Sequence, residues 1–173
     1  MDESNPIEPL LRAHQTRAFS ERPVAEASLD VIADAARWSG SRENRQPWRF
    51  ILIRTPETVR RVGEVGAPDA RTLATAPAAL AIALPQDKSA AISNAFDEGR
   101  AAERMLVAAE LLGLGAGLAW IGSEQRPAVA ELLGVPDGWF VRTIVAVGHP
   151  AEPAAERSRL PAAEVVFRER WQA

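Results

Sequence analysis

Apolar residues recur at the spacing of an α-helix in one long stretch of the chain, from 94 to 112. A period near 3.6 residues places these positions on one face of a helix. The stripe consists of Phe96, Ala101, Met105, Leu106, Ala108, Ala109 and Leu112. We therefore predict a central helix whose charged residues lie mainly on a solvated face. Those residues are Asp97, Glu98, Arg100, Glu103 and Arg104.

Shorter helical patterns flank this central stretch. Helices are expected at 6–13, 25–39, 55–66 and 127–133. Thr55 and Pro56 suit the cap and the first position of the third of these helices. Trp38, at the end of the second helix, is expected to pack in the core, with the border of the site as the alternative.

Three stretches have the patterns of β-strands. Residues 49–54 follow Pro47 and alternate between the two faces, whereas 78–84 is a continuous apolar run typical of a buried strand. Residues 140–147 form the third predicted strand, which ends at Gly148. Between these strands, glycines occupy every second position from Gly113 to Gly117, which indicates a backbone packed tightly against something flat.

A small-polar loop, 39–46, leads into the first strand. Its short side chains can donate and accept hydrogen bonds, and Gly40 allows unusual backbone angles. Such a loop on a rigid strand suits a ligand site. An ordinary helix-to-strand connection explains the same composition equally well.

Composition limits the chemistry available to the chain. The 173 residues, 47% of them hydrophobic, suit one domain spanning 1–173. With no Cys, no Tyr and two His, the chain lacks thiolate nucleophiles and is poor in groups that titrate near neutral pH, and it suits no metal site. If the protein is an enzyme, a cofactor is expected to supply the chemistry.

Charge and hydropathy narrow the partners and the location. A net charge of -3 argues against a nucleic-acid partner. The longest uncharged run, 72–86, is interrupted by Pro77 and Pro85, so we expect no membrane span. The acidic start of the chain lacks an apolar signal core, which predicts a cytoplasmic location.

The loop and the strand after it carry a resemblance to a known family. The segment SGSRENRQPWRF, 39–50, resembles "S-P-S-x-x-N-x-Q-P-W-x-F" of the FMN-dependent nitroreductase family, with Gly40 in place of proline. In that family the serines and the asparagine lie against the flavin ring of the neighbouring subunit. The resemblance therefore implies flavin contacts by Ser39, Ser41 and Asn44.

Basic segments near both ends of the chain resemble the phosphate site of the same family. Residues 13–19 are similar to "R-[RH]-S-x-[RK]-x-F", although Ala13 replaces the first basic residue and Gln15 the serine. The resemblance implies that His14, Gln15 and Arg17 hold the FMN phosphate. It also implies that Arg157 and Arg159 return to this phosphate and that the tail, 150–173, packs on the partner subunit. Composition alone predicts a disordered end here.

Two further segments complete the resemblance. Residues 113–122 are similar to the family's "G-L-G-x-x-W-I-G", whose backbone amides approach flavin N5 and O4, which implies Trp120, Gly122 and Ser123. A basic residue before the second strand contacts the flavin in that family, and Arg71 has this place. The glycine run contains neither a G-x-G-x-x-G fingerprint nor a G-K-[ST] loop.

Together the motifs imply an α+β, nitroreductase-like fold with a central mixed, mainly antiparallel β-sheet flanked by helices, in an intertwined homodimer. Each subunit would bind one FMN, take hydride from NAD(P)H and reduce a nitroaromatic, a quinone or a similar small acceptor by a ping-pong mechanism. No catalytic side chain is expected. Two alternatives stay open: a flavin-binding sensor or carrier without turnover, and a flavin-fragmenting or deazaflavin-related member of the same fold.

Overall fold

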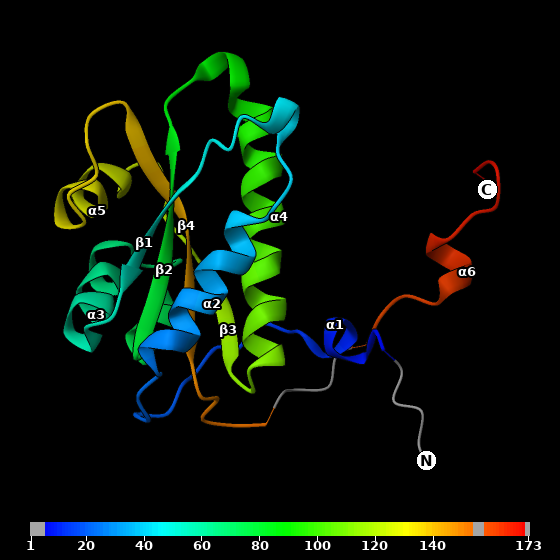
Figure 1. Ribbon diagram of the computed structural model, residues 1–173, viewed down its shortest axis with the longest axis horizontal. Coiled ribbons are helices and arrows are strands. Elements are labelled where there is room, and N and C mark those ends of the chain that lie inside the picture. Colours follow the sequence, from blue (N-terminus) through cyan, green and yellow to red (C-terminus); the bar gives the residue numbers. More distant parts are fainter. Residues whose placement is uncertain (1–5, 154–157, 172–173) are drawn as a thin grey trace.

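Four antiparallel strands form one sheet in a computed structural model that describes residues 6–153 and 158–171 (Figure 1). The order across the sheet is β1-β2-β4-β3. The strands are β1 (Arg49–Ile53), β2 (Ala78–Pro85), β3 (Gly115–Trp120) and β4 (Trp139–Gly148). β2 and β4 are the two inner strands, and helices cover both of their faces, which suits their nearly continuous apolar sequences.

Helices cover both faces of the sheet (Figure 1). α2 (Glu26–Arg37) and α4 (Ala91–Leu111) lie on one face, and α3 (Pro56–Val65) and α5 (Arg126–Leu132) lie on the other. The α+β fold with a mainly antiparallel sheet is thus confirmed. Within the described residues, no helix is both long enough and apolar enough to cross a bilayer.

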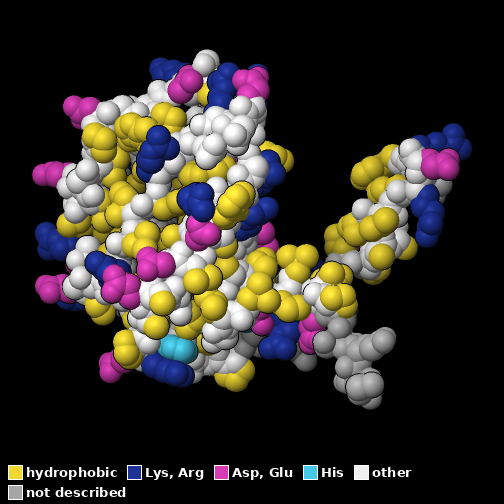
Figure 2. Space-filling model, viewed as in Figure 1, with side chains coloured by type: hydrophobic (Ala, Val, Ile, Leu, Met, Phe, Trp, Pro, Cys, Tyr) yellow, Lys and Arg dark blue, Asp and Glu magenta, His cyan; other side chains and the backbone are white. Residues whose placement is uncertain are grey.

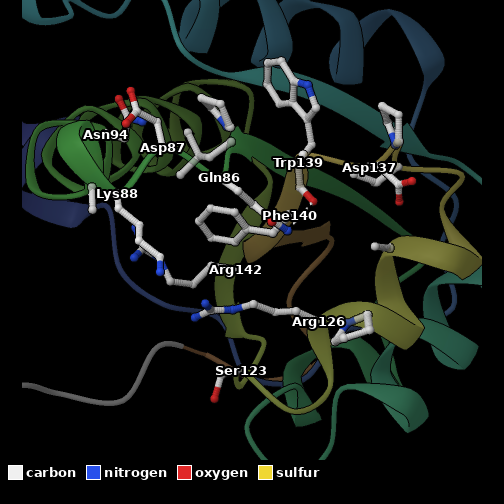
Figure 3. A pocket seen from close by; sticks show the side chains of 18 of the residues that line it. Gln86, Asp87, Lys88, Asn94, Ser123, Arg126, Asp137, Trp139, Phe140 and Arg142 are labelled. Carbon is white, nitrogen blue, oxygen red and sulfur yellow. Dashed lines mark hydrogen bonds between the residues drawn. The ribbon is translucent and has the colours of Figure 1, made fainter.

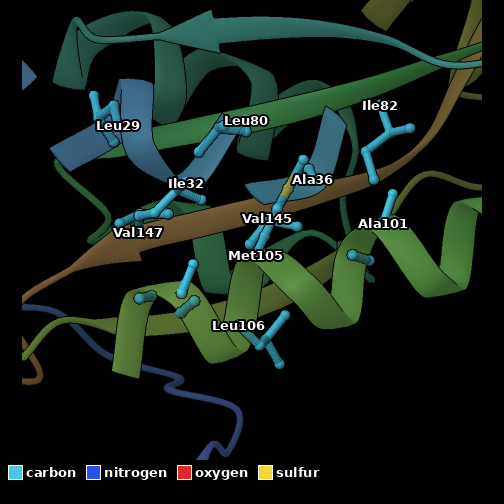
Figure 4. Packing of buried hydrophobic residues seen from close by; sticks show 14 of the residues in the cluster. Leu29, Ile32, Ala36, Leu80, Ile82, Ala101, Met105, Leu106, Val145 and Val147 are labelled. Carbon is cyan, nitrogen blue, oxygen red and sulfur yellow. The ribbon is translucent and has the colours of Figure 1, made fainter. Parts of the chain in front are cut away.

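Large and small side chains alternate along β2 and are sorted between the two layers. Leu80 and Ile82 face α2 and α4, where Ile32 and Met105 are fully buried (Figure 4). The alanines of β2 at 79, 81 and 83 face α3 and α5. The period of two along a strand produces this division.

The glycine-rich run is strand β3, and what packs on it is the chain's own N-terminal segment. A Cβ atom at Gly117 would lie 2.1 Å from the backbone oxygen of Thr16. The Thr16 amide donates to the carbonyl of Ala116 at 2.8 Å, next to a parallel bridge between Gln15 and Ala116. Close backbone approach therefore explains why this strand lacks side chains at alternate positions.

Short elements connect and extend this frame. They are α1 (Glu8–Arg12), α6 (Ala162–Val165) and three 3-10 turns: η1 (Arg42–Asn44), η2 (Arg71–Ala74) and η3 (Lys88–Ala90). α6 projects away from the sheet and its helices (Figure 1). Thr55 occupies the N-cap of α3 and Pro56 its first turn, as predicted, although the Thr55 side chain makes no capping bond.

The expected burial of four side chains is wrong. Trp38 is 67% exposed and Phe96 is 69% exposed, whereas Asp97 and Glu98 are each 2% exposed. Trp38 caps the end of α2, where its ring faces the Arg37 guanidinium at 5.1 Å instead of the core. The two acids are buried because each binds a partner from another element, as the site geometry shows.

Candidate functional site

The loop between α2 and β1 has an unusual backbone. Glu43, Asn44 and Gln46 have φ values of 52°, 54° and 50°. A residue with a side chain costs about 1 kcal/mol or more in this left-handed region, and such strain persists only where the surroundings fix it. Ser41 Oγ accepts from the Gln46 amide at 2.9 Å, and the buried Asp97 carboxylate accepts from the Arg42 amide at 3.0 Å. These two bonds hold the loop in its shape.

The fixed loop presents some of its predicted site residues and hides another. Asn44 is exposed and Ser41 is half-buried, whereas Ser39 is buried. Among the described residues, the Ser39 hydroxyl has no hydrogen-bond partner. Arg100 lies against Gly40, where a Cβ would be 2.3 Å from Arg100 Nη2. Ser41 and Asn44 are therefore accessible to a ligand outside the chain, and the flavin contact of Ser39 stays a prediction.

The other predicted residues gather along β3. His14, Gln15 and Arg17 belong to the segment that runs beside this strand, and Arg71 lies on η2, which also approaches it. The Trp120 amide donates to Asp69 O at 3.3 Å, and Thr72 Oγ1 donates to Leu118 O at 3.5 Å. Gly122 and Ser123 follow directly after the strand.

Arginine and histidine side chains near β3 have few partners within the described residues. Arg71 Nε donates to Pro68 O at 3.0 Å, and His14 Nδ1 donates to Arg12 O at 2.8 Å. Arg17 is exposed and has no hydrogen-bond or ion-pair partner within 6–153 and 158–171. Its guanidinium is therefore available to an anion.

Of the two C-terminal arginines predicted to bind the phosphate, the structure describes one. Arg157 lies outside the described residues. Arg159 is exposed, and its Nη1 donates to Ser158 O at 3.3 Å. The structure does not bring Arg159 into contact with Arg17.

The loop and the segment that holds His14 and Arg17 lie far apart on one protomer. The loop contacts α4 at Asp97, whereas Arg12, just before His14, pairs with Glu110 at 3.3 Å near the other end of that helix. A rise of 1.5 Å per residue places these two contacts about 20 Å apart along α4. One chain alone therefore does not bring the two groups together.

A large cavity lies at one end of the sheet. It is bordered by the end of β2, the start of β4, α5 and the start of α4, and its volume is about 980 Å³ (Figure 3). Three basic residues line it: Lys88, Arg126 and Arg142. Of the residues predicted from the sequence, only Ser123 lines it.

A buried ion pair fixes one of these arginines. Arg142 Nε and Nη2 both donate to Glu98 Oε2, with the Nε bond at 2.9 Å. The Arg142 guanidinium also lies 5.2 Å from the centre of the Trp120 ring. Glu98 thereby holds Arg142 in place at the cavity wall.

The second arginine is less well compensated. Arg126 Nε donates to Ile121 O at 3.2 Å, and its guanidinium lies 5.0 Å from the centre of the Phe140 ring. Burial lowers the pKa of Arg126, and the nearby charge of Arg142 lowers it further, while Glu98 opposes the shift. Two neighbouring cations thus lie near one carboxylate, and only Arg142 is paired with it.

Comparison with known proteins shows which family the chain belongs to. The profile of the Nitroreductase family matches residues 11–69 and 66–149, which together form most of the sequence. The chain belongs to the nitroreductase family. The resemblance seen in the four sequence motifs is thus confirmed.

Individual relatives in the nitroreductase family match over most of their length. A protein of Archaeoglobus fulgidus, provisionally named an NADH dehydrogenase/NAD(P)H nitroreductase, is 30% identical over 142 residues, 79% of this chain and 80% of its own. An "FMN reductase [NAD(P)H]" of Bacillus subtilis is 27% identical over 95% of this chain and 74% of its own. The solved structure of the hypothetical oxidoreductase YcnD from B. subtilis has a TM-score of 0.85 at 24% identity, covering 96% of this chain and 74% of that one, which supports the fold.

Sequence reasoning missed the Glu98–Arg142 pair of this nitroreductase-family chain. A signal for Glu98 was present, because Glu98 lies three and seven residues before the buried Ala101 and Met105 and therefore shares their helix face. Its partner is 44 residues away in sequence, and no local pattern connects them. Arg126 carries no sequence signal that distinguishes it from the other arginines.

Proposed function

We propose that this chain is an FMN-dependent oxidoreductase that uses NAD(P)H to reduce a small oxidised acceptor, such as a nitroaromatic or a quinone. Membership of the nitroreductase family and the names of relatives, among them FMN reductases from B. subtilis, support this proposal. The observation that carries it at the site is Arg17, an uncompensated cation beside β3. A cytoplasmic location stays a prediction.

The donor groups present fit FMN. Its phosphate needs charge-assisted hydrogen bonds, which Arg17 and His14 can supply, with Gln15 as a neutral neighbour. Its ring needs neutral donors and acceptors, which Arg71's segment and the backbone after Trp120 offer at one end of β3. Ser41 and Asn44 add polar groups from a rigid loop.

The chemistry follows the division of labour between a cofactor and its protein. Bound FMN supplies hydride acceptance from the nicotinamide and donation to the acceptor, in a ping-pong order. The residues above bind and orient it, and none of them needs to act as a nucleophile. Arg159, and Arg157 from the undescribed part of the chain, remain proposed partners of the phosphate.

A homodimer completes this proposal. Along α4, the loop lies about 20 Å from the contact that Arg12 makes just before His14, so a second subunit is needed to bring Ser41 and Asn44 to a ligand held by His14 and Arg17. Exposed apolar side chains support such a contact: Ile92 is 89% and Phe96 69% exposed, on α4 beside the loop. The projecting C-terminal segment also exposes Leu160, Val165, Val166 and Trp171, which appear as a yellow patch in Figure 2. Packing of 150–173 on the partner would cover them.

Purified protein is expected to be yellow, with the absorption bands of bound flavin, and to oxidise NADH or NADPH when a quinone or nitroaromatic is present. Absorption spectroscopy and steady-state kinetics measure the two properties separately. Failure to bind added FMN contradicts the proposal. Flavin bound without turnover favours the sensor or carrier alternative, and consumption of the flavin itself favours a flavin-fragmenting enzyme.

Replacing Phe96 with glutamate is expected to convert the dimer to a monomer and to release flavin, because a charge would be buried at the proposed subunit contact. Analytical ultracentrifugation at micromolar concentration and the flavin-to-protein absorbance ratio are the measurements. The control is Arg61→Glu on α3, which lies on the opposite face of the sheet and should leave both unchanged. A stable, flavin-loaded monomer of the unaltered protein rules out the dimer proposal.

A further inference from the structure

The cavity at the end of the sheet has an excess of positive charge on one wall. Arg126 and Arg142 extend toward the same side in Figure 3, and Lys88 lies across from them. Only Arg142 has an acidic partner among the described residues, and that partner, Glu98, is buried behind it. Arg126 and Lys88 are left without a carboxylate within ion-pair distance in the described part of the chain.

Arg126 is better suited to a ligand than to a structural role. Its Nε is occupied by the carbonyl of Ile121, and no described residue accepts a bond from its two terminal nitrogens. Burial and the charge of Arg142 both disfavour its charged form, which lowers its pKa. An anion placed between the two guanidinium groups would offset both effects.

The acidic residues of the cavity do not neutralise this wall. Asp87 accepts hydrogen bonds from the Ser89 amide at 2.9 Å and the Ser89 hydroxyl at 2.6 Å, and these bonds, the hydroxyl first, lower its pKa. Asp137 lies on the far side of the cavity from Arg126 in Figure 3. Within the described residues, neither these two acids nor Glu131 pairs with a cavity cation.

The rest of the cavity is largely apolar and aromatic. Trp139 and Phe140 line it together with Leu84, Pro127 and Ala130. A volume of about 980 Å³ lies within the range of small-molecule sites. Ser123, which the sequence motif places at the flavin ring, borders the same cavity.

We propose that this cavity binds a small aromatic molecule through an oxyanion, a carboxylate or a phosphate, that is held by Arg126 and Arg142. Planar guanidinium groups match the geometry of both oxyanions, and Glu98 keeps Arg142 in the required position. In the second part of the proposal, which rests on the function proposed above, the anionic aromatic molecule is the acceptor that is reduced beside Ser123.

Calorimetric titration of the purified protein tests the site without turnover. The probes are benzoate, its neutral isostere benzamide, and inorganic phosphate. Benzoate is expected to bind more tightly than benzamide, and Arg126→Gln should weaken benzoate at least about tenfold, the usual effect of losing a charged hydrogen bond. Arg126→Lys should keep part of the affinity, and Arg61→Gln on α3 should keep all of it.

Comparison of the separate benzoate and phosphate titrations shows whether the site takes a carboxylate or a phosphate. Phosphate binding that is lost in Arg126→Gln, with no benzoate binding, assigns the site to a phosphate group, and the reverse pattern assigns it to a carboxylate. Equal affinity for benzoate and benzamide without phosphate binding overturns the proposal. Affinities that are unchanged in Arg126→Gln also overturn it.

The acceptor is tested by the ratio of kcat/KM for 4-nitrobenzoate to that for 4-nitrobenzamide. The ratio should exceed one and fall at least about tenfold in Arg126→Gln, because only the first substrate has the charge. A ratio unaffected by the substitution overturns the second part of the proposal. If the protein binds benzoate but reduces neither nitro compound, the result counts against the proposed oxidoreductase function and still supports the anion site.

Discussion

Replacing Glu98 with alanine is expected to lower the free energy of unfolding by about 3 kcal/mol, at the lower end of the cost of breaking a buried ion pair. The reason is that Arg142, whose side chain is 18% exposed, loses the carboxylate that accepts two of its hydrogen bonds. The lower end applies because water reaches part of this guanidinium. Urea unfolding followed by circular dichroism measures the change.

The matched control for this change is Glu103→Ala, and both variants are compared in the Phe96→Glu background because Glu103 lies on the α4 face that carries Phe96. Glu103 lies on the same helix, is exposed, and has no ion-pair partner among the described residues. Its replacement should change the free energy of unfolding by no more than about 0.5 kcal/mol. If both variants have the same stability, the Glu98–Arg142 pair does not contribute as its geometry indicates.

Gly117→Ala is the second substitution with a large expected effect, a loss of about 3 kcal/mol in the free energy of unfolding, at the upper end for overpacking. The new Cβ would lie 2.1 Å from Thr16 O and 2.8 Å from Thr72 Cγ2. The first of these is a backbone atom, so relief requires the N-terminal segment to move off β3. Thermal and urea unfolding measure the stability, and a flavin titration should show weaker FMN binding because Arg17 moves with Thr16.

Gly99→Ala provides the control of opposite sign. Gly99 is exposed in the middle of α4, and a Cβ there would have no heavy atom within 4 Å. In the Phe96→Glu background, which removes the proposed subunit contact on this face of α4, alanine should stabilise the helix by up to about 1 kcal/mol. A Gly117→Ala protein as stable as the unaltered chain would show that the N-terminal segment does not lie against β3 as described.

Local pattern was enough for most of the secondary structure. The alternation in 49–54 and the apolar runs at 78–84 and 140–147 predicted β1, β2 and β4 to within a residue or two. β3 was not assigned as a strand, since glycine contributes neither a burial pattern nor a strand preference. Its conformation depends on pairing with β4 and with Gln15, both distant in sequence.

The candidate site was predictable in its residues and not in its arrangement. The four motifs named the site residues, but only the three-dimensional structure shows that the loop contacts α4 at Asp97 while Arg12, just before His14, contacts it at Glu110. Asp97 and Glu98 were assigned to solvent because of their charge, although the spacing of Glu98 from Ala101 and Met105 places it on the buried helix face. Their burial follows from partners on other elements, Arg42 and Arg142, which periodicity does not take into account.

The alternation of large and small side chains along β2 limits which substitutions each face of the strand can accept. On the side of α2 and α4, Leu80 and Ile82 can exchange for other branched residues of similar volume at a cost below about 1.5 kcal/mol. On the side of α3 and α5, the alanines of β2 are fully or almost fully buried. A larger residue there would need space that is already filled by Val59 and Val62, which are themselves fully buried. One face of the same strand therefore accepts substitution while the other is nearly fixed, so sequence variation among descendants of this chain should be concentrated in the α2–α4 layer.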